Sequence, residues 1–438
     1  MAFLGDLLTS VADRGRALIN FERFAATRRQ PLDALCEDLL SGRGEASGMA
    51  LAQAVLDQWK GLDDAGRLAF FRLLQERFGP DRARLDAALE RYRANPDAEA
   101  ITQLHLASEP RRQELFRRLN LAPGGTHVLV RMRESLFAAM EQEPALKAVD
   151  ADFRHLFGSW FNRGFLVLRR IDWTTPANVL EKIIRYEAVH AIKDWDDLRR
   201  RLEPADRRCF AFFHPQLVDE PLIFVEVALT TDIPSRIADL LSEARDVLPA
   251  ASATTAVFYS ISNCQEGLRG ISFGNFLIKQ VAEDLKRELP GLDVFVTLSP
   301  VPGLARWLAS VLADPAALGL ANEEAALLMQ GPGGSAEEVA RRDKLLGQMT
   351  AHYMLRARTG SGRVIDPVAR FHLGNGARLE RINVGGNPTE RGLRESHGVM
   401  VNYRYELGEI EVNHEAFASR NIVVASASVK RQLRPAGN

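Results

Sequence analysis

The sequence is poor in cysteine. Only three cysteines occur among 438 residues, Cys36, Cys209 and Cys264, and no C-x-x-C pair is present. Zinc ribbons and thioredoxin-type redox sites need such closely spaced pairs, so neither is expected. We expect the three thiols to be buried and reduced. Cys264 is followed closely by a glycine-bearing loop, so the alternative of an accessible, oxidisable thiol stays open there.

The sequence also lacks a surplus of one charge and any long apolar run. Its formal net charge is −1, whereas nucleic-acid binding needs clustered basic residues, so no nucleic-acid partner is expected. The basic run 199–201 follows two aspartates, and we interpret it as a solvated helix face. The most apolar segment, 222–229, is interrupted by Glu226 and is far shorter than the roughly 18 residues of a membrane span. The segment 222–229 therefore predicts a buried strand. No membrane partner is expected.

Targeting signals are also missing from the two ends of the sequence. Residues 1–6 lack the basic stretch and long apolar run of a secretory signal. Residues 435–438 read Pro-Ala-Gly-Asn, which is not a peroxisomal tripeptide. We therefore expect a cytoplasmic protein.

Residues 1–160 predict an all-α helical bundle. Apolar residues recur at intervals of three and four, as between Leu68 and Phe78, and breakers containing proline and glycine divide the segment into pieces of helix length. The histidines here, such as His155, are isolated, and we interpret them as surface or packing residues. This part of the chain shows no catalytic constellation.

Residues 161–438 predict a mixed α/β domain. Strand-like runs rich in β-branched and aromatic residues, such as 256–261 and 294–298, alternate with helical segments, such as 235–247 and 276–289. Strands that alternate with helices are typical of α/β architectures.

A glycine-bearing loop, 269–275, reads Arg-Gly-Ile-Ser-Phe-Gly-Asn between a predicted strand and a predicted helix. A loop that opens a helix presents unpaired backbone N–H groups and the positive end of the helix dipole, which suit a phosphate or pyrophosphate. A tight connection without a ligand is the alternative. Residues 270–274 also fit G-x-S-x-G, but a nucleophile elbow needs a strand that runs straight into the turn, and a polar stretch intervenes here.

Other catalytic signatures are absent. The sequence contains neither H-E-x-x-H nor G-x-x-x-x-G-K-[ST], so zincin-type metal catalysis and P-loop hydrolysis are not supported. No metal ligands are proposed.

Three further segments are candidates for chemistry. Ser299 follows the 294–298 strand, and Pro300 favours an extended conformation for it at the strand end, where α/β folds place functional side chains. A simple Ser-Pro turn is the alternative. His372 lies in an apolar segment that we interpret as a strand, where a satisfied core histidine is the alternative. Residues 402–405 concentrate polar and aromatic groups that suit a pocket lining or a core cap.

Taken together, these segments resemble the malonyl-CoA decarboxylase family. The matching pieces occur in the family's order and approximate spacing, across both predicted domains but with less motif information in the first. They are Phe258–Ser262, Gln265–Gly270 with Gly274 and Phe276–Lys279, Leu298–Gly303, Phe371–Ala377 and Asn402–Tyr405. The resemblance makes Ser272 a loop residue and not a nucleophile.

The resemblance implies a helical oligomerisation domain at 1–160, which forms a homodimer or homotetramer, and a catalytic domain of GNAT-type (acyl-CoA N-acyltransferase-like) fold at 161–438. It implies that Ser299 and His372 are the catalytic pair and that Asn402 and Tyr405 are positioning candidates. The CoA-binding loop would comprise Arg269, Gly270, Ile271, Ser272, Phe273, Gly274 and Asn275.

The implied reaction is decarboxylation of malonyl-CoA to acetyl-CoA and CO2. It needs no metal or cofactor, because the thioester carbonyl of the substrate can accept the charge that CO2 leaves behind. An acyl-CoA-dependent N-acyltransferase, a serine hydrolase that uses Ser272, and a non-catalytic CoA-binding regulator are the alternatives.

Overall fold

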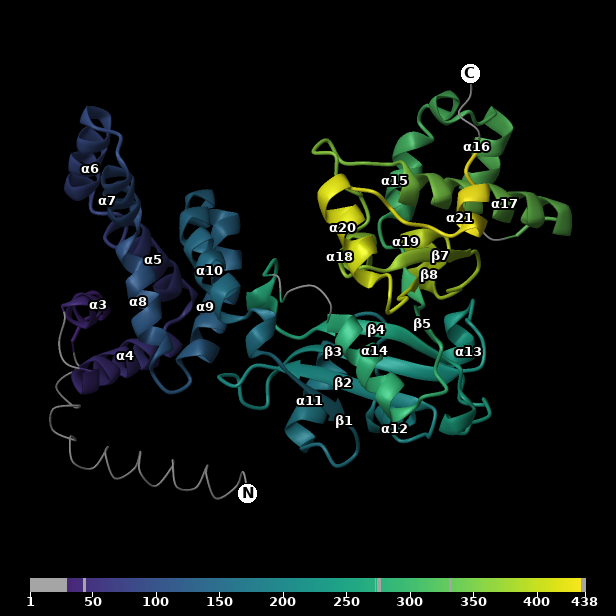
Figure 1. Cartoon of the computed structure of the whole chain (residues 1–438), viewed down its shortest axis with the longest axis horizontal. Coiled ribbons are helices and arrows are strands. Elements are labelled where there is room, and N and C mark those ends of the chain that lie inside the picture. Colours follow the sequence, from purple (N-terminus) through teal and green to yellow (C-terminus); the bar gives the residue numbers. More distant parts are fainter. Residues whose placement is uncertain (1–29, 42–44, 272, 274–276, 331–332, 435–438) are drawn as a thin grey trace. The chain divides into compact units, whose positions relative to one another are not determined.

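The computed structural model of the chain describes residues 30–41, 45–271, 273, 277–330 and 333–434 (Figure 1). The chain divides into two compact units, each named here by its content. The helical unit takes in residues up to Phe165 together with Pro215–Val218 and Gln265–Ser272, and the sheet unit takes in Leu166–His214, Asp219–Cys264 and the residues from Phe273 onward. The segment 265–271 therefore belongs to the helical unit, although it follows a strand of the sheet.

The helical unit is all-α in its described residues, as the apolar periodicity of residues 1–160 predicts. Aspartates cap several of its helices: Asp63, Asp81 and Asp97 each accept a hydrogen bond from the backbone N–H three residues later. The helices are α3 (Leu32–Leu40), α4 (Glu45–Lys60), α5 (Asp64–Glu76), α6 (Arg82–Ala94), α7 (Ala98–Ser108), α8 (Arg111–Asn120), α9 (Gly125–Gln142) and α10 (Lys147–Trp160), with short 3-10 turns at Pro144–Leu146, Arg163–Phe165 and Glu266–Leu268.

The sheet unit is built on an eight-stranded mixed sheet in the described part of the chain, with strand order β1-β2-β3-β4-β5-β8-β6 and with β7 paired to β8. The β4 and β5 strands are parallel, whereas the other paired strands are antiparallel. The strands are β1 (Val167–Ile171), β2 (Arg207–Phe213), β3 (Pro221–Thr230), β4 (Thr255–Asn263), β5 (Val294–Thr297), β6 (Ser299–Pro300), β7 (Arg378–Asn383) and β8 (Met400–Arg404). The predicted fold class, a helical part followed by a mixed α/β domain, is confirmed.

Helices of the sheet unit alternate with these strands. They are α11 (Ala177–Tyr186), α12 (Trp195–Leu202), α13 (Ile237–Leu241), α14 (Leu277–Glu288), α15 (Leu304–Val311), α16 (Asn322–Met329), α17 (Ala336–Leu355), α18 (Pro367–Gly374), α19 (Glu390–Ser396), α20 (Ile410–Arg420) and α21 (Ala427–Arg431). The helix predicted over 235–247 is wrong beyond Leu241. There, the Arg245 side chain and the Leu248 N–H both bind the Asp206 carboxylate, which holds the segment outside a helix.

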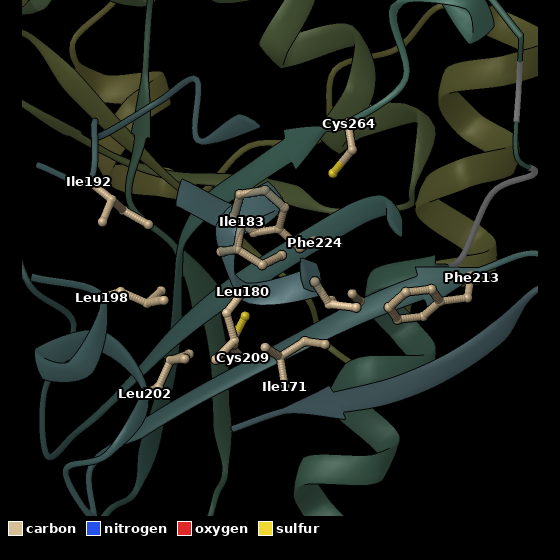
Figure 2. Packing of buried hydrophobic residues seen from close by; sticks show 12 residues of the cluster. Ile171, Leu180, Ile183, Ile192, Leu198, Leu202, Cys209, Phe213, Phe224 and Cys264 are labelled. Carbon is tan, nitrogen blue, oxygen red and sulfur yellow. The ribbon is translucent and has the colours of Figure 1, made fainter. Parts of the chain in front are cut away.

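An apolar core fills the space between the sheet and helices α11 and α12 (Figure 2). Ile171, Phe213 and Phe224 contribute from the strands, and Leu180 and Ile183 contribute from α11. Cys209 and Cys264 lie in the same cluster, and Cys36 is buried in the helical unit. The prediction of buried thiols is confirmed, and the alternative of an accessible Cys264 is wrong, because only 2% of that residue is exposed.

The basic run 199–201 does lie on a helix, α12, but its interpretation as a solvated face is wrong for Arg201. This side chain points inward with Leu198 and Leu202, and its guanidinium lies 3.2 Å from both Asp197 and the buried Glu226 of β3. The helical period of 3.6 explains the difference, because residues three and four apart share the buried face of α12. The predicted buried strand at 222–229 is confirmed as part of β3.

Candidate active site

The parallel pairing of β4 and β5 ends inside the sheet. Its last partners are Phe258 and Thr297, after which β4 continues alone toward Asn263 on that side. A β-bulge lies at the same level: Glu226 pairs with Ser260 and Val227 with Phe258, so Tyr259 is the extra residue in β4. Bulges bend a strand and redirect its side chains. The two parallel strands therefore separate at their carboxyl ends, which is where α/β sheets bind ligands.

A pocket of about 230 Å³ lies at this separation. Ligand pockets are commonly apolar clefts with a few convergent polar groups, and this one fits that description. Its wall comes from β4, from the Ser-Pro segment of β6 and from α18. The lining residues are Val189, Phe258, Tyr259, Ile261, Asn263, Ser299, Pro300, Pro367, Val368, Phe371 and His372.

Ser299 and His372 meet at the wall of this pocket. The hydroxyl oxygen of Ser299 lies 3.1 Å from Nε2 of His372, although the residues are 73 positions apart in the sequence. Both side chains are buried, with 5% and 3% of each residue exposed. This distance is within the reach that nucleophile or proton-transfer partners require.

His372 lies on helix α18 and not on a strand, so that part of the sequence interpretation is wrong. The Asp366 carboxylate caps the helix by accepting the N–H of Ala369 at 2.9 Å, and Pro367 occupies the first turn. An aspartate followed by proline is a helix-start signal that outweighs the apolar run after it. The helix turns His372 toward Ser299.

Two tyrosines of the 402–405 segment hold the imidazole from its other sides. The Tyr405 hydroxyl lies 2.8 Å from Nδ1 of His372, and the Tyr403 ring stacks on the imidazole with centroids 4.6 Å apart. Burial raises the pKa of Tyr405 well above its usual value, so its hydroxyl stays protonated. Tyr405 therefore contacts the predicted pair through His372, and its role as a positioning residue stays a prediction.

Thr297 extends this network and was missed at the sequence level. The Ser299 hydroxyl donates to the Thr297 hydroxyl at 2.8 Å, and the Tyr403 N–H donates to the same oxygen at 3.1 Å. The signal was available, since Thr297 and Ser299 are two residues apart and side chains alternate along an extended chain. Because Ser299 donates its hydrogen to Thr297, its lone pairs are free to accept from His372.

Burial sets the charge of the imidazole. It lowers the pKa of His372 from 6.5 to about 3, so the ring is neutral at neutral pH in the empty pocket. A neutral imidazole carries a hydrogen on one ring nitrogen only. With Tyr405 donating to Nδ1, that hydrogen lies on Nε2 and is directed to Ser299.

Asn402 is buried but does not line the pocket. Its amide nitrogen donates to the Thr297 carbonyl at 2.8 Å, and its amide oxygen accepts from Asn383 at 2.8 Å and from Arg381 at 3.1 Å. These bonds hold the end of β5, from which Ser299 follows. The Asn402 side chain therefore contacts the strand that carries Ser299 into the site, and not the pocket itself.

The predicted CoA loop belongs in part to the helical unit. Arg269, Gly270 and Ile271 are described there and Phe273 is buried, whereas Ser272, Gly274 and Asn275 lie outside the described residues. The Arg269 and Ile271 N–H groups donate to the carbonyls of Glu266 and Leu268 at 2.9 and 3.0 Å. Those two amides are therefore already bonded within turns of the chain.

Two features are missing from the described residues. Within them, no group of three or more histidine, cysteine, aspartate or glutamate side chains is arranged to hold a metal ion. Within the same residues, no helix has the length and apolar character to cross a membrane.

Comparison with known proteins gives one consistent family. The model of the malonyl-CoA decarboxylase C-terminal domain matches residues 164–438, and that of the malonyl-CoA decarboxylase N-terminal domain matches residues 78–161. The crystal structure of malonyl-CoA decarboxylase from Rhodopseudomonas palustris is 57% identical, with a TM-score of 0.87 over 91% of this chain and 98% of that chain.

Two further relatives agree. The malonyl-CoA decarboxylase structure from Agrobacterium vitis is also 57% identical, with a TM-score of 0.86 over 92% of this chain and 100% of that chain. The mitochondrial malonyl-CoA decarboxylase of Anser anser anser is 34% identical over 407 residues, which cover 85% of this chain and 81% of that protein.

Proposed function

The chain belongs to the malonyl-CoA decarboxylase family, and we propose that it is a carboxy-lyase that converts malonyl-CoA to acetyl-CoA and CO2 at the pocket between β4, β6 and α18. The observation that carries the assignment of the site is the buried pair of Ser299 and His372, 3.1 Å apart on the pocket wall. Their sequence motifs are among those on which the resemblance to the family rests.

The substrate supplies its own electron sink. The bond between C2 and the carboxylate breaks, and its electron pair moves into the thioester carbonyl to form an enolate. C2 then takes one proton and becomes the methyl group of acetyl-CoA. The protein has to stabilise the developing oxyanion with preorganised donors and to deliver that proton. No step of the proposed reaction needs a metal or an organic cofactor.

His372 is the proposed proton donor. The empty pocket keeps it neutral, but the malonyl carboxylate brings a negative charge beside the ring, and an opposite charge at close range favours the imidazolium. When CO2 leaves, that charge moves onto the enolate, and the imidazolium returns to its neutral form by giving its proton to C2. One proton is consumed in each turnover, as the overall reaction requires.

Ser299 and the β4 backbone have separate proposed roles. The Ser299 hydroxyl donates to Thr297 in the empty pocket, and we propose that it turns this hydrogen to the malonyl carboxylate when the substrate binds and so orients it. The backbone amides beside the Tyr259 bulge, beyond the end of the β4–β5 pairing, are the proposed donors to the thioester oxygen. The separation of the two strands supports this role, because it leaves room for a thioester beside the β4 backbone.

Residues 269–275 are proposed to hold CoA, and the helical unit is proposed to join copies of this chain. The glycine turn at Gly270, with φ of +76°, and the position of the loop before α14 support the first proposal. The all-α character of the first unit is compatible with the second, since helical faces commonly pair between subunits.

One assay tests the reaction and the site together. Purified protein is incubated with malonyl-CoA and without an acyl acceptor, in the presence of EDTA, and acetyl-CoA, CO2 and free CoA are measured. We expect acetyl-CoA and CO2 in equal amounts in the wild type. The His372→Asn and Ser299→Ala variants should lose about 100-fold or more in kcat while their circular dichroism spectra stay unchanged.

The other outcomes decide between functions. Free CoA without CO2 would indicate a thioesterase, and turnover only after an amine is added would indicate an N-acyltransferase. Near-normal decarboxylation by a folded His372→Asn variant would refute the catalytic pair but not the reaction. Loss of activity in EDTA, with recovery after a divalent metal is added, would refute the metal-independent mechanism.

A further inference from the structure

A hollow of about 340 Å³ opens on the helical unit, next to the predicted CoA loop. Helix α10 supplies Arg154 and His155 to it, both exposed, and the loop supplies the turn at Gly270 and Ile271. Two small residues of α10, Ala151 and Gly158, keep the space open. The hollow therefore combines the cationic Arg154, the imidazole of His155, a glycine turn and an apolar patch.

The loop side of the hollow is fixed to helix α9. The Gln265 side chain accepts from Arg131 at 2.8 Å, and the Arg133 guanidinium donates to the carbonyls of Gly267 and Arg269 at 2.8 and 3.0 Å. Gly267 lies so close to α9 that a Cβ there would be 2.0 Å from the carbonyl oxygen of Val130. The turn at Gly270 is consequently held by the helical unit.

Arg154 leaves a net positive charge around the hollow, because the two other arginines nearby are paired with acids. Arg133 and Arg269 each have an acidic partner, Asp150 at 2.8 Å and Glu266 at 2.6 Å. Within the described residues, Arg154 forms no ion pair. Burial lowers the pKa of Arg133, and the neighbouring positive charges of Arg154 and Arg269 lower it further, so each of these two guanidinium groups repels that of Arg133. An anion in the hollow would relieve that repulsion.

We propose that this hollow binds the phosphorylated nucleotide end of coenzyme A, with Arg154 and His155 as its side-chain ligands. The inference rests on the proposed function and extends it, because it gives the helical unit a part in substrate binding besides self-association. Arginine suits phosphate because its planar fork can donate two hydrogen bonds to one anion. Ala151 and Ile271 offer an apolar surface to the sugar or the base.

The engaged amides of the loop favour side-chain ligands here. Arg269 and Ile271 already donate their N–H groups within the chain, so these two amides are not available to a phosphate. Arg154 and His155 of α10 lie beside the same turn. The hollow is also within the size range of pockets that bind cofactors, roughly 300–1,000 Å³.

Two substrates separate this proposal from the proposed reaction. Malonyl-CoA carries the nucleotide, whereas malonyl-pantetheine has the same thioester without it. In Arg154→Ala we expect the KM for malonyl-CoA to rise about tenfold, which corresponds to one charge-assisted hydrogen bond of about 1.4 kcal/mol, with kcat unchanged. The KM for malonyl-pantetheine should stay at the wild-type value. Arg154→Lys should recover part of the affinity, because it keeps the charge but not the fork.

An exposed arginine elsewhere in the same unit gives the matched control. Arg84 lies near the start of α6 and does not line the hollow, so Arg84→Ala should leave both KM values unchanged. An equal rise of both KM values in Arg154→Ala, or a rise of neither, would overturn the proposal. So would an effect of the same size in Arg84→Ala.

Direct binding keeps the inference testable if the chain proves not to decarboxylate malonyl-CoA. Calorimetry with adenosine 3′,5′-bisphosphate, which has the phosphates but no thioester, should show binding to the wild type and about tenfold weaker binding to Arg154→Ala. Binding should also weaken as salt rises from 50 to 500 mM, because these charges are exposed. Equal affinities of the two proteins, or no binding to either, would overturn the proposal whatever the reaction is.

Discussion

The hydroxyl of Tyr405 lies 2.8 Å from Nδ1 of His372, while Nε2 of the same ring lies 3.1 Å from the Ser299 hydroxyl. The buried phenol needs an acceptor for its hydrogen, and Nδ1 provides one. Because Nδ1 accepts the hydrogen of Tyr405, the imidazole hydrogen lies on Nε2, the nitrogen beside the pocket. Tyr405 thereby fixes the tautomer of the neutral imidazole and directs its N–H toward Ser299 at the pocket wall.

Removing the Tyr405 hydroxyl should therefore reduce catalysis more than binding. We expect Tyr405→Phe to lower kcat by about 10- to 100-fold, because the ring can then adopt the other tautomer, with little change in KM. Steady-state kinetics over pH 5–9 provide the measurement. Tyr403→Phe is the matched control: the Tyr403 hydroxyl is buried without a hydrogen-bond partner among the described residues, so its removal should leave kcat near the wild-type value. Equal losses in both variants would show that ring packing, and not the tautomer, is responsible.

Acid should destabilise the sheet unit in part through His372. Folding lowers the pKa of this group from 6.5 to about 3, so the unfolded chain binds more protons between these two pH values. The contribution to stability is fully present above pH 6.5 and is lost as the pH falls toward 3. Melting temperatures measured from pH 7 to pH 4 should fall less steeply in His372→Asn than in the wild type. Burial also lowers the pKa of His190 to about 3, so the melting temperature of the variant should still fall with pH, but less steeply than that of the wild type. Parallel curves for the two proteins would contradict the assignment.

Two glycines of the helical unit should respond oppositely to alanine. A Cβ at Gly267 would meet the Val130 carbonyl oxygen at 2.0 Å, so Gly267→Ala should cost about 1–3 kcal/mol through forced displacement of backbone. Gly48, on helix α4, has nothing within 4 Å of such a Cβ, and Gly48→Ala should stabilise that helix by about 0.5–1 kcal/mol. Urea unfolding curves report both changes. A tolerated Gly267→Ala would show that the segment is not held against α9 as closely as described.

The three cysteines should be inert in the folded chain. Burial raises the pKa of Cys36 to about 12 and those of Cys209 and Cys264 well above their usual range, so the reactive thiolate is scarce at pH 8. We expect Ellman's reagent to react slowly with the native protein and to titrate all three thiols after guanidinium unfolding. Rapid reaction of Cys264 in the native state, identified by mass spectrometry, would refute its place in the core of Figure 2.

Neighbouring arginines on α12 should differ in their effect on stability. Arg201→Ala leaves the buried Glu226 without its cationic partner, and breaking a buried pair in this way typically costs about 3–5 kcal/mol. Arg199 is half exposed and lies over the ring of Trp173, so Arg199→Ala should cost only about 0.5–1 kcal/mol. Thermal unfolding of the two variants under the same buffer conditions tests the contrast. Similar losses would mean that Arg201 is solvated after all.

The local patterns predicted the elements of the sheet unit better than their contacts. Strand-like runs at 222–229, 256–261 and 294–298 correspond to β3, β4 and β5, because their apolar and β-branched residues are buried in the sheet. The helix of His372 was missed because its start signal, Asp366 and Pro367, was given less weight than the apolar residues after it.

Contacts between distant segments had no local signal. Ser299 and His372 are 73 positions apart in the sequence and lie within hydrogen-bond distance. Arg133 and Gly267 are 134 positions apart, and the Arg133 guanidinium donates to the Gly267 carbonyl. Periodicity and turn chemistry describe only near neighbours, so neither contact follows from them. The first was expected solely through the resemblance to a family, and the second was not expected at all.

The attachment of segment 265–271 to helix α9 has a practical consequence for dissecting the protein. A shortened chain that starts at Leu166 would retain Ser299, His372 and Tyr405, yet it would remove the guanidinium groups of Arg131 and Arg133 on which this segment depends. The boundary between the two units in the sequence, after Phe165, is thus not a boundary between independent parts of the structure. Such a fragment would expose Gly267 and the apolar face of its turn to water, and it would be a poor substitute for the full-length chain in studies of ligand binding.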